Sequence, residues 1–263
     1  MSRILVVAGT DSSGGAGLSR DIAMAQSLSC AVSPVVTAVT VQTNAALIAS
    51  HPVPPEIIAA QVKAAFAPAS PAPRAVKIGM IGTPQAAQSL AQCLEHCLEQ
   101  CLALALPVQV PIVLDPVLKS SSGGVLMSPA ALAPVLSKVT VLTPNLEESA
   151  RLAGRPHSAP APVDQDEIAA RARVILASGV GAVLIKGGHG TGAQSVDHLF
   201  TKDSHQIFSA PRLPGTKRGT GCSLATALAC ALAQGASLAE ACSQAKTQIS
   251  QWLSAPDESQ SLD

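Results

Sequence analysis

Along most of the chain, short runs of apolar and often β-branched residues alternate with longer segments of helical periodicity. This alternation constrains the fold more than any other feature. The runs predict strands at Arg3–Ala8, Val32–Val39, Ala75–Ile78, Val110–Leu114, Val139–Leu142 and Gly181–Lys186. Most are apolar throughout, as is typical of parallel strands covered on both faces. A further pair, Val196–Phe200 and Gln206–Ser209, predicts a hairpin at the edge of the sheet.

Helical segments lie between the predicted strands and close the chain. They are expected at Ala16–Leu28, Pro55–Phe66, Pro84–Leu104, Pro129–Ser137, Asn145–Ala153, Asp166–Ala177, Thr220–Ala233 and Leu238–Leu253. Strand–helix alternation implies right-handed β-α-β units, so we expect an α/β fold: a three-layer α/β/α sandwich with a mostly parallel central sheet. The stretch Gly154–Val163 is predicted to be a surface loop, so residues 1–263 are expected to form a single domain.

Composition excludes several classes of function. The 17 basic and 17 acidic residues cancel, which argues against electrostatic capture of nucleic acid or of an anionic membrane. Three Phe, one Trp and no Tyr leave too few rings for a platform that stacks bases. No stretch approaches the ~20 apolar residues of a membrane span. The seven cysteines include no C-x-x-C pair, so we expect no disulfide framework and a cytoplasmic location.

The segments that suggest chemistry all follow predicted strands. They are Gly9–Gly17, Thr40–Asn44, Gly79–Met80, Asp115–Gly124, Thr143–Glu148 and Gly187–Gly192. In parallel α/β sheets, ligands bind outside the carboxyl ends of the strands. The clustering therefore predicts an active site at that edge of the sheet and favours an enzyme over a scaffold.

The run Gly219–Cys222 immediately precedes a helix rich in Ala and Leu. Glycines let backbone N–H groups converge, and a helix N-terminus adds positive potential, so this turn could hold a phosphoryl group. A plain helix start would look the same. Cys222 lies in the first helical turn, where the dipole lowers the pKa of a thiol, and is a candidate base or nucleophile. By contrast, Cys93, Cys97 and Cys101 repeat along one helix face and are expected to pack, because one face cannot surround a metal ion.

Polar residues after three other strands suggest a cation and a nucleotide. Asn145 and Glu148 begin a helix, where acids are common for dipole reasons alone. The alternative is Mg²⁺ held through water, to which Asp115 could add charge. Lys186 ends an apolar run and could meet nucleotide phosphates, although a lysine at a strand end is more often simply solvated.

The glycine-rich loop Gly9–Gly17 resembles a phosphate loop but lacks the Lys-Ser/Thr pair of a P-loop. Its glycines would instead let backbone close around a small substrate. Gln42 follows a strand, and its amide could donate to a ring nitrogen while accepting from an adjacent exocyclic amine, as Gln does when it reads adenine. An ordinary loop amide is the other interpretation.

Nine pieces of the sequence carry a resemblance over nearly the whole chain. They are AGTDSSGGAG (8–17), TAVTVQ (37–42), HPVPPE (51–56), VKIGMIG (76–82), VLDPV (113–117), TPNLEE (143–148), VLIKGGH (183–189), FSAPRL (208–213) and GTGCSLATAL (219–228). One such piece would be weak, whereas nine in register are highly specific. The chain resembles the hydroxymethylpyrimidine and phosphomethylpyrimidine kinase family of thiamin biosynthesis, within the ribokinase-like superfamily.

The resemblance implies a phosphotransferase that uses ATP and Mg²⁺. The first transfer would be to the hydroxymethyl oxygen of 4-amino-5-hydroxymethyl-2-methylpyrimidine, and the second would convert the monophosphate to the diphosphate. The small-molecule partners would be this aminopyrimidine and ATP, with no nucleic acid and no membrane. The family-based expectation for assembly is a homodimer.

The resemblance also assigns roles position by position. The residues expected to bind or enclose the aminopyrimidine are Gln42, Asp21, Gly9, Ala16, Met80 and Val117. The residues expected to form the anion hole are Gly219, Thr220 and Gly221, and Cys222 would be the catalytic residue. The residue expected at the nucleotide is Lys186, and those expected around Mg²⁺ are Asp115, Asn145 and Glu148.

The chain departs from the family pattern at three places. The flap after VLDPV reads Ser121–Gly124 where the family has a Lys-Ser-Gly-Asp-like stretch, and Arg218 stands where a histidine is usual. The first helix begins Leu18-Ser-Arg-Asp21 where Gln-Ala-Asp is favoured.

Two other functions remain open. One is a pyridoxal-type kinase on the same fold, although pyridoxal has no exocyclic amine beside a ring nitrogen for Gln42 to bind. The other is a non-catalytic pyrimidine-binding regulator, which the altered flap favours and an intact anion hole with Cys222 disfavours.

Overall fold

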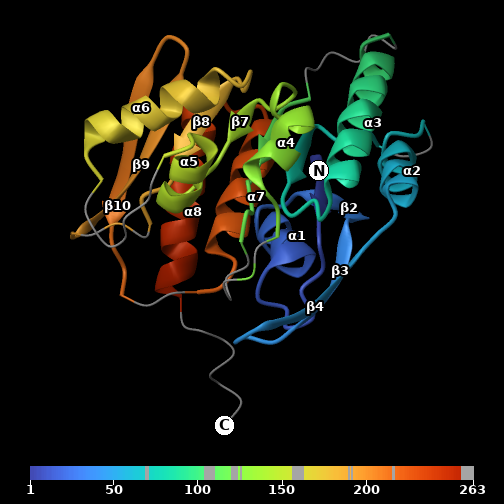
Figure 1. Ribbon diagram of the computed structural model, residues 1–263, viewed down its shortest axis with the longest axis horizontal. Helices are drawn as coiled ribbons and strands as arrows, with labels where there is room; N and C mark the ends of the chain where they lie inside the picture. The colour runs from blue at the N-terminus through green and yellow to red at the C-terminus, as the bar shows by residue number, and fades with distance from the viewer. Residues whose placement is uncertain are drawn as a thin grey trace.

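The computed structural model describes residues 1–68, 71–103, 110–119, 124, 126–155, 163–188, 190, 192–214 and 217–255. Its centre is an eight-stranded sheet in the order β10-β9-β8-β7-β6-β5-β1-β2, with a separate two-stranded ribbon, β3-β4 (Figure 1). The strands are β1 (Arg3–Ala8), β2 (Ala31–Val36), β3 (Ala38–Gln42), β4 (Leu47–Pro52), β5 (Ala75–Ile78), β6 (Ile112–Leu114), β7 (Val141–Leu142), β8 (Ala182–Ile185), β9 (Gln194–Thr201) and β10 (His205–Pro211). Neighbours from β2 to β8 pair in parallel, whereas β9 and β10 are antiparallel.

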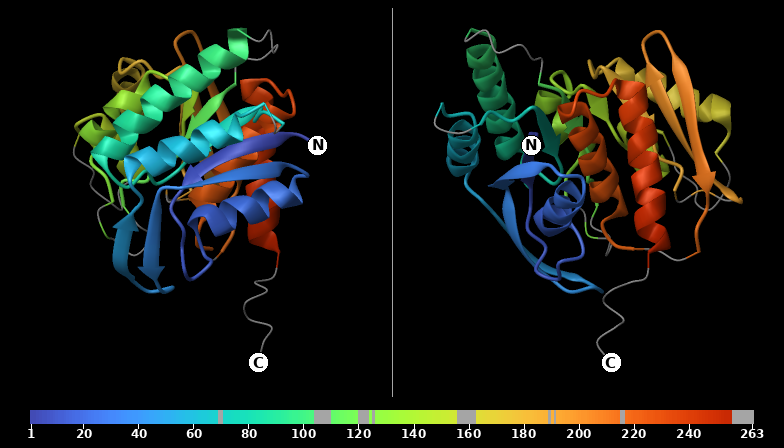
Figure 2. Two further views of the ribbon diagram at one scale, coloured as in Figure 1. Left: turned by 90° about the vertical axis from the view of Figure 1, so that its right-hand side faces the viewer. Right: turned by 180° about the vertical axis from the view of Figure 1, so that it is seen from behind.

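Helices cover both faces of the sheet. They are α1 (Gly17–Ser27), α2 (Pro55–Ala65), α3 (Pro84–Ala103), α4 (Pro129–Leu136), α5 (Leu146–Leu152), α6 (Gln165–Leu176), α7 (Thr220–Ala233) and α8 (Leu238–Ser254). Seen from behind, α1, α7 and α8 lie in front of the sheet (Figure 2), and α2 to α6 cover the opposite face. The expected three-layer sandwich with a mostly parallel sheet is confirmed.

Most of the central strands are apolar throughout because both of their faces are buried. In β1, Ile4 and Val6 pack into the core beneath α1, α7 and α8, while Leu5 and Val7 pack into the core beneath the other helices. Alternate side chains therefore reach two separate hydrophobic cores, so the strand has no face for polar residues. In the part of the chain that the structure describes, no helix is long and apolar enough to cross a membrane.

The strand predicted at Val32–Val39 is wrong in its extent, because the chain leaves the main sheet at Thr37. The Thr37 hydroxyl donates to the Met80 carbonyl at 2.6 Å, and the Thr37 carbonyl accepts from the N–H of Val53 at 2.9 Å. The chain then forms β3, which pairs antiparallel with the unpredicted strand β4. The resulting ribbon projects past the carboxyl edge of the sheet (Figure 1).

The predicted edge hairpin is confirmed as β9 and β10, and all eight predicted helices are present with ends shifted by a few residues. Two predicted loops fall largely outside the described residues. The residues that are not described are 121–123 of the flap and 156–162 of the loop predicted at Gly154–Val163.

Candidate active site

The turn that begins α7 packs directly against the glycine loop that follows β1. Gly219 has a φ of +77°, and a Cβ atom there would come within 2.5 Å of the Gly15 carbonyl oxygen. Only glycine fits this position, because a side chain would be strained by the left-handed backbone and would collide with the loop. Thr220 stabilises the turn by donating its hydroxyl to the Lys217 carbonyl at 2.6 Å.

Lys186 and Asp115 meet the same turn from the other side. The Lys186 ammonium lies 2.8 Å from the Asp115 carboxylate, and both side chains are almost buried. A Cβ atom on Gly221 would lie 3.2 Å from Lys186 Nζ and 3.4 Å from Asp115 Oδ2. Burial alone would lower the pKa of Lys186, but Asp115 and Glu148 outweigh it and raise that pKa, so the lysine stays charged. The structure thus brings together the predicted anion hole, nucleotide lysine and acidic residue.

Asn145 and Glu148 form a reciprocal cap on α5. The Asn145 side chain accepts from the Glu148 N–H at 2.8 Å, and the Glu148 carboxylate accepts from the Asn145 N–H at 2.9 Å. This is a capping box, and it occupies the Asn145 oxygen that was expected to face a cation. Burial raises the pKa of Glu148 to about 7, an effect that Asp115 increases and Lys186 opposes.

Among the described residues, no group of three or more His, Cys, Asp or Glu side chains could hold a metal ion. Asp115 and Glu148 are nevertheless close enough for their charges to interact. Two neighbouring carboxylates suit a cation that keeps most of its water, as Mg²⁺ does, better than one held by a complete protein cage. An ion here would be met by these two carboxylates through water, since Lys186 already pairs with Asp115 and the Asn145 N–H already bonds to Glu148.

Cys222 lies in the first turn of α7, as expected, but its electrostatics differ from expectation. Removal of the thiol from bulk water raises the pKa of Cys222 to about 11, although the charge of Lys77 and the backbone N–H of Gly17 lower it. The prediction that the pKa of Cys222 falls below the usual value of a thiol is therefore wrong. Desolvation, to which the charges of Asp21 and Asp115 add, exceeds the effects of Lys77 and the Gly17 N–H, so the resting side chain is a neutral thiol at pH 7.

Asp21, expected at the substrate, lies in a fully buried ion pair. Its carboxylate accepts from Lys77 at 2.6 Å and from the Thr226 hydroxyl at 2.8 Å, and neither charged side chain has any exposed surface. Because Asp21 is fully buried, its contact with a substrate stays a prediction. Sequence reasoning missed Lys77, although a lone lysine inside the apolar run of β5 was a signal, since buried lysines need a partner.

The other residues expected around the substrate come from three segments. Gly9 approaches Met80 closely, because a Cβ atom on Gly9 would lie 3.3 Å from the Met80 sulfur. Ala16 is the residue before α1 and lies against Gly219. Val117 follows β6 and donates its N–H to the Asp115 carbonyl at 2.9 Å.

Gln42 ends β3, and the glycine loop holds its backbone. The Ser12 hydroxyl donates to the Gln42 carbonyl and accepts from the Gln42 N–H, both at 2.8 Å. These two bonds fix where the Gln42 side chain begins, at the carboxyl edge of the sheet. Its contact with a ring stays a prediction.

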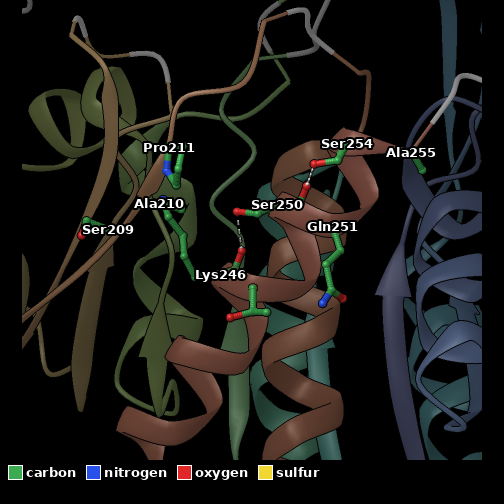
Figure 3. Close-up of a pocket in the computed structure, with 9 residues that line it drawn as sticks. Ser209, Ala210, Pro211, Lys246, Ser250, Gln251, Ser254 and Ala255 are labelled. Carbon is green, nitrogen blue, oxygen red and sulfur yellow. Dashed lines mark hydrogen bonds between the residues drawn. The ribbon is translucent and has the colours of Figure 1, made fainter.

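A groove of about 600 Å³ lies between the end of β10 and the last turns of α8 (Figure 3). Lys246, which lines it, pairs with Asp197 at 2.9 Å, and the other oxygen of Asp197 accepts from the N–H of Gly187 at 2.9 Å. At the end of α8, Lys217 donates to the Ala255 carbonyl at 2.6 Å. The groove is thus linked to the segment after Lys186 and to the segment before Gly219.

Comparison with known proteins adds independent information. The sequence model of the phosphomethylpyrimidine kinase family matches residues 11–261. A hydroxymethylpyrimidine/phosphomethylpyrimidine kinase of Salmonella typhimurium is 36% identical over an aligned length of 263 residues. The alignment covers 97% of this chain and 91% of that protein.

Solved structures with the same fold include members of two kinase groups. The crystal structure of phosphomethylpyrimidine kinase from Clostridium difficile superposes with a TM-score of 0.76 at 29% identity, covering 96% of this chain and 100% of that one. An ADP complex of Bacillus subtilis pyridoxal kinase superposes with a TM-score of 0.78 at 26% identity, covering 94% and 89% of the two chains.

Proposed function

The chain belongs to the phosphomethylpyrimidine kinase family, and from this premise we propose that it phosphorylates an aminopyrimidine alcohol twice at the expense of ATP. The acceptor would be the hydroxymethyl oxygen of 4-amino-5-hydroxymethyl-2-methylpyrimidine, and the monophosphate would then accept a second phosphoryl group. One observation carries the proposal. The glycine turn before α7 meets Lys186 and Asp115 at the carboxyl edge of the sheet, with atoms 3.2 and 3.4 Å from the Cβ position of Gly221.

In the first transfer, the alcohol oxygen forms a bond to the γ-phosphorus while the bond from that phosphorus to the oxygen bridging to ADP breaks. Backbone N–H groups of Gly219, Thr220 and Gly221 would donate to the phosphoryl oxygens, where charge develops. The alcohol proton would pass to the sulfur of Cys222 once the resting thiol has lost its own proton to solvent. In the second transfer the acceptor is already an anion, so it needs alignment more than a base.

Lys186 and Asp115 would exchange partners when ATP binds. The Lys186 ammonium is charged and paired with Asp115 in the structure. Phosphate oxygens would draw Lys186 away and leave Asp115, with Glu148, to hold hydrated Mg²⁺. When bound, that ion would supply charge neutralisation to the phosphates.

The groove between β10 and α8 would take the nucleoside part of ATP. Its links through Asp197 to Gly187 and through Lys217 to the segment before Gly219 support this placement. A nucleotide lying there would direct its phosphates toward Lys186.

A pyridoxal-type kinase is the second candidate, favoured by the structural similarity to pyridoxal kinases. Steady-state assays of the purified protein with ATP and each alcohol would decide between them. We expect the aminopyrimidine alcohol to have the higher kcat/KM, because Gln42 can bind its amine and ring nitrogen together. Higher kcat/KM for pyridoxal would overturn this choice. Calorimetric binding of the aminopyrimidine without ATP turnover would instead indicate a regulator.

Two properties of the whole protein complete the proposal. All seven cysteines are free, which supports a cytoplasmic location. A homodimer is supported by apolar side chains on the ribbon: Val39, Val41 and Ile48 are 50%, 44% and 66% exposed. Large apolar side chains exposed on one projecting element are typical of an interface.

A further inference from the structure

Arg218, the residue immediately before the anion hole, reaches away from it to two other parts of the site. Its guanidinium pairs with Asp11 at 3.1 Å and donates to the Ser13 hydroxyl at 2.6 Å, both in the glycine loop. It also donates to the Asn44 side chain at 3.0 Å and to the Thr43 carbonyl at 3.3 Å, in the turn of the β3-β4 ribbon. One side chain thus joins three segments that lie far apart in the sequence.

The partners of Arg218 are themselves held in place. The second oxygen of the Asp11 carboxylate accepts from the N–H of Ser13 at 2.9 Å and from its hydroxyl at 2.7 Å. Asp11 is almost fully buried, and Gly15 leaves room for the guanidinium, since a Cβ atom there would lie 3.1 Å from it. The planar fork of arginine suits several fixed acceptors at once, which the single ammonium of lysine does not.

The same loop holds Gln42. Ser12, between Asp11 and Ser13, makes both backbone bonds to Gln42, and the Thr40 hydroxyl donates to the Thr10 carbonyl at 2.7 Å. Movement of this loop would therefore carry Gln42 with it. Since Arg218 is covalently next to Gly219, the position of Gln42 is tied to the position of the anion hole.

A role for Arg218 as a ligand of substrate phosphate is the competing interpretation. The pairing with Asp11 cancels its charge, and its two terminal nitrogens already have four acceptors in the protein. A phosphate would have to displace these partners. The contacts favour a tie between segments over an anion site.

We propose that Arg218 is a positioning residue that holds the ribbon and the glycine loop in register with the anion hole, so that the pyrimidine bound at Gln42 presents its hydroxymethyl oxygen to the phosphoryl group. The proposal rests on the proposed function. Loss of the tie would weaken pyrimidine binding and misalign the acceptor, and it would leave the nucleotide side of the site intact. Small misplacements of a reacting group are enough to cost large factors in rate.

The test compares Arg218→Gln with Arg218→Lys and with a control, Arg155→Gln. The control breaks an exposed ion pair with Glu167, 2.7 Å long, outside the site. For Arg218→Gln we expect the KM of the aminopyrimidine alcohol to rise about tenfold or more and kcat to fall, with the KM of ATP within about twofold. Arg218→Lys should rescue little, and the control should match the unmodified protein.

Hydrogen exchange supplies a readout that does not depend on turnover. In Arg218→Gln, amides of β3 and β4 should exchange faster while amides of β1 and β5 keep their protection, so that the loosening is local. Unchanged exchange in the ribbon, or equal rises in both KM values, would overturn the proposal. A rise confined to the KM of the monophosphate would also overturn it and indicate a phosphate ligand. If the unmodified protein phosphorylates no aminopyrimidine, the proposed function fails, whereas the exchange experiment still tests the tie.

Discussion

Lys77 and Asp21 form a fully buried ion pair that is bonded to Thr226 of α7. Burial alone would lower the pKa of Lys77, but Asp21 outweighs it and raises that pKa, so the lysine keeps its charge. Removing two charges from water costs several kcal/mol per ion, so such a pair is a poor means of stabilisation by itself. Its position is more informative, because the Lys77 charge also lowers the pKa of Cys222. We therefore interpret the pair as two of the charged groups that influence the pKa of the Cys222 thiol.

Replacing Lys77 by Met should destabilise the protein by about 3–5 kcal/mol, because Asp21 would remain buried without its partner. Denaturant unfolding would measure the change. The double variant Lys77→Met/Asp21→Asn is the control: it removes both charges and should recover much of the lost stability, since the asparagine amide can still bond to Thr226. A single variant within about 1 kcal/mol of the unmodified protein would contradict the account of the pair.

Gln42→Ala should raise the KM of the aminopyrimidine far more than the KM of ATP. A buried amine and ring nitrogen would each lose a partner, which costs about 1–3 kcal/mol. Steady-state kinetics with each substrate varied in turn would measure both constants. Equal effects on the two would mean that Gln42 lies outside the pyrimidine pocket.

At the scale of elements, the residues proposed to bind the phosphoryl group lie at the start of α7. The turn from Gly219 to Gly221 is fixed by the left-handed backbone of Gly219 and faces Lys186 and Asp115 across Gly221. A side chain added at Gly221 would therefore lie next to the proposed position of the phosphoryl group. The helix N-terminus adds positive potential at the same point.

Gly221→Ala should lower kcat by about 10²-fold, because its methyl group would occupy the space beside Lys186 and disturb the anion hole. The melting temperature should not fall, since Ala is favoured over Gly inside a helix. Gln92→Ala, which also places an alanine inside a helix but at an exposed position of α3, is the control and should leave kcat unchanged. Near-normal kcat in Gly221→Ala would show that the turn serves only to begin the helix.

The sheet and the helices could be predicted from the alternation of apolar runs with helical segments, and the same alternation predicts that the candidate site residues share one edge of the sheet. The ribbon could not, because the sequence Leu47–Pro52 alternates only weakly and its pairing depends on where Thr37 leaves the main sheet. The partner of Asp21 lies 56 residues away and is set by the tertiary fold. The pKa of Cys222 was mispredicted for a related reason: position in a helix is visible in a sequence, whereas desolvation is not.

At the scale of the molecule, two hydrophobic cores share one sheet, and the candidate site lies at the carboxyl edge of that sheet. This arrangement supports the proposal that residues 1–263 act as a single domain. The ribbon projects beyond the edge (Figure 2), and it carries exposed apolar residues. It is the element through which two copies would meet.

Val41→Lys should convert the proposed dimer to a monomer, because a charge would enter an apolar interface. Light scattering coupled to size exclusion would measure the mass. Val174→Lys, on an exposed residue of α6, is the control and should leave the dimer intact. A monomeric unmodified protein, or a dimer that survives Val41→Lys, would contradict this role of the ribbon.

The most direct test of the account is the rate of each phosphorylation in Cys222→Ala, measured separately and as a function of pH after the melting temperature has been checked. With a thiol pKa of about 11, the thiolate fraction rises with pH, so the first transfer should accelerate from pH 7 to 9 in the unmodified protein. Cys222→Ala should slow that transfer by about 10²-fold or more and abolish its rise above pH 8, where Glu148, whose pKa burial raises to about 7, is already ionised. The second transfer should be affected much less, because its acceptor is already an anion. Equal losses in both transfers would contradict the assignment of Cys222 as the base.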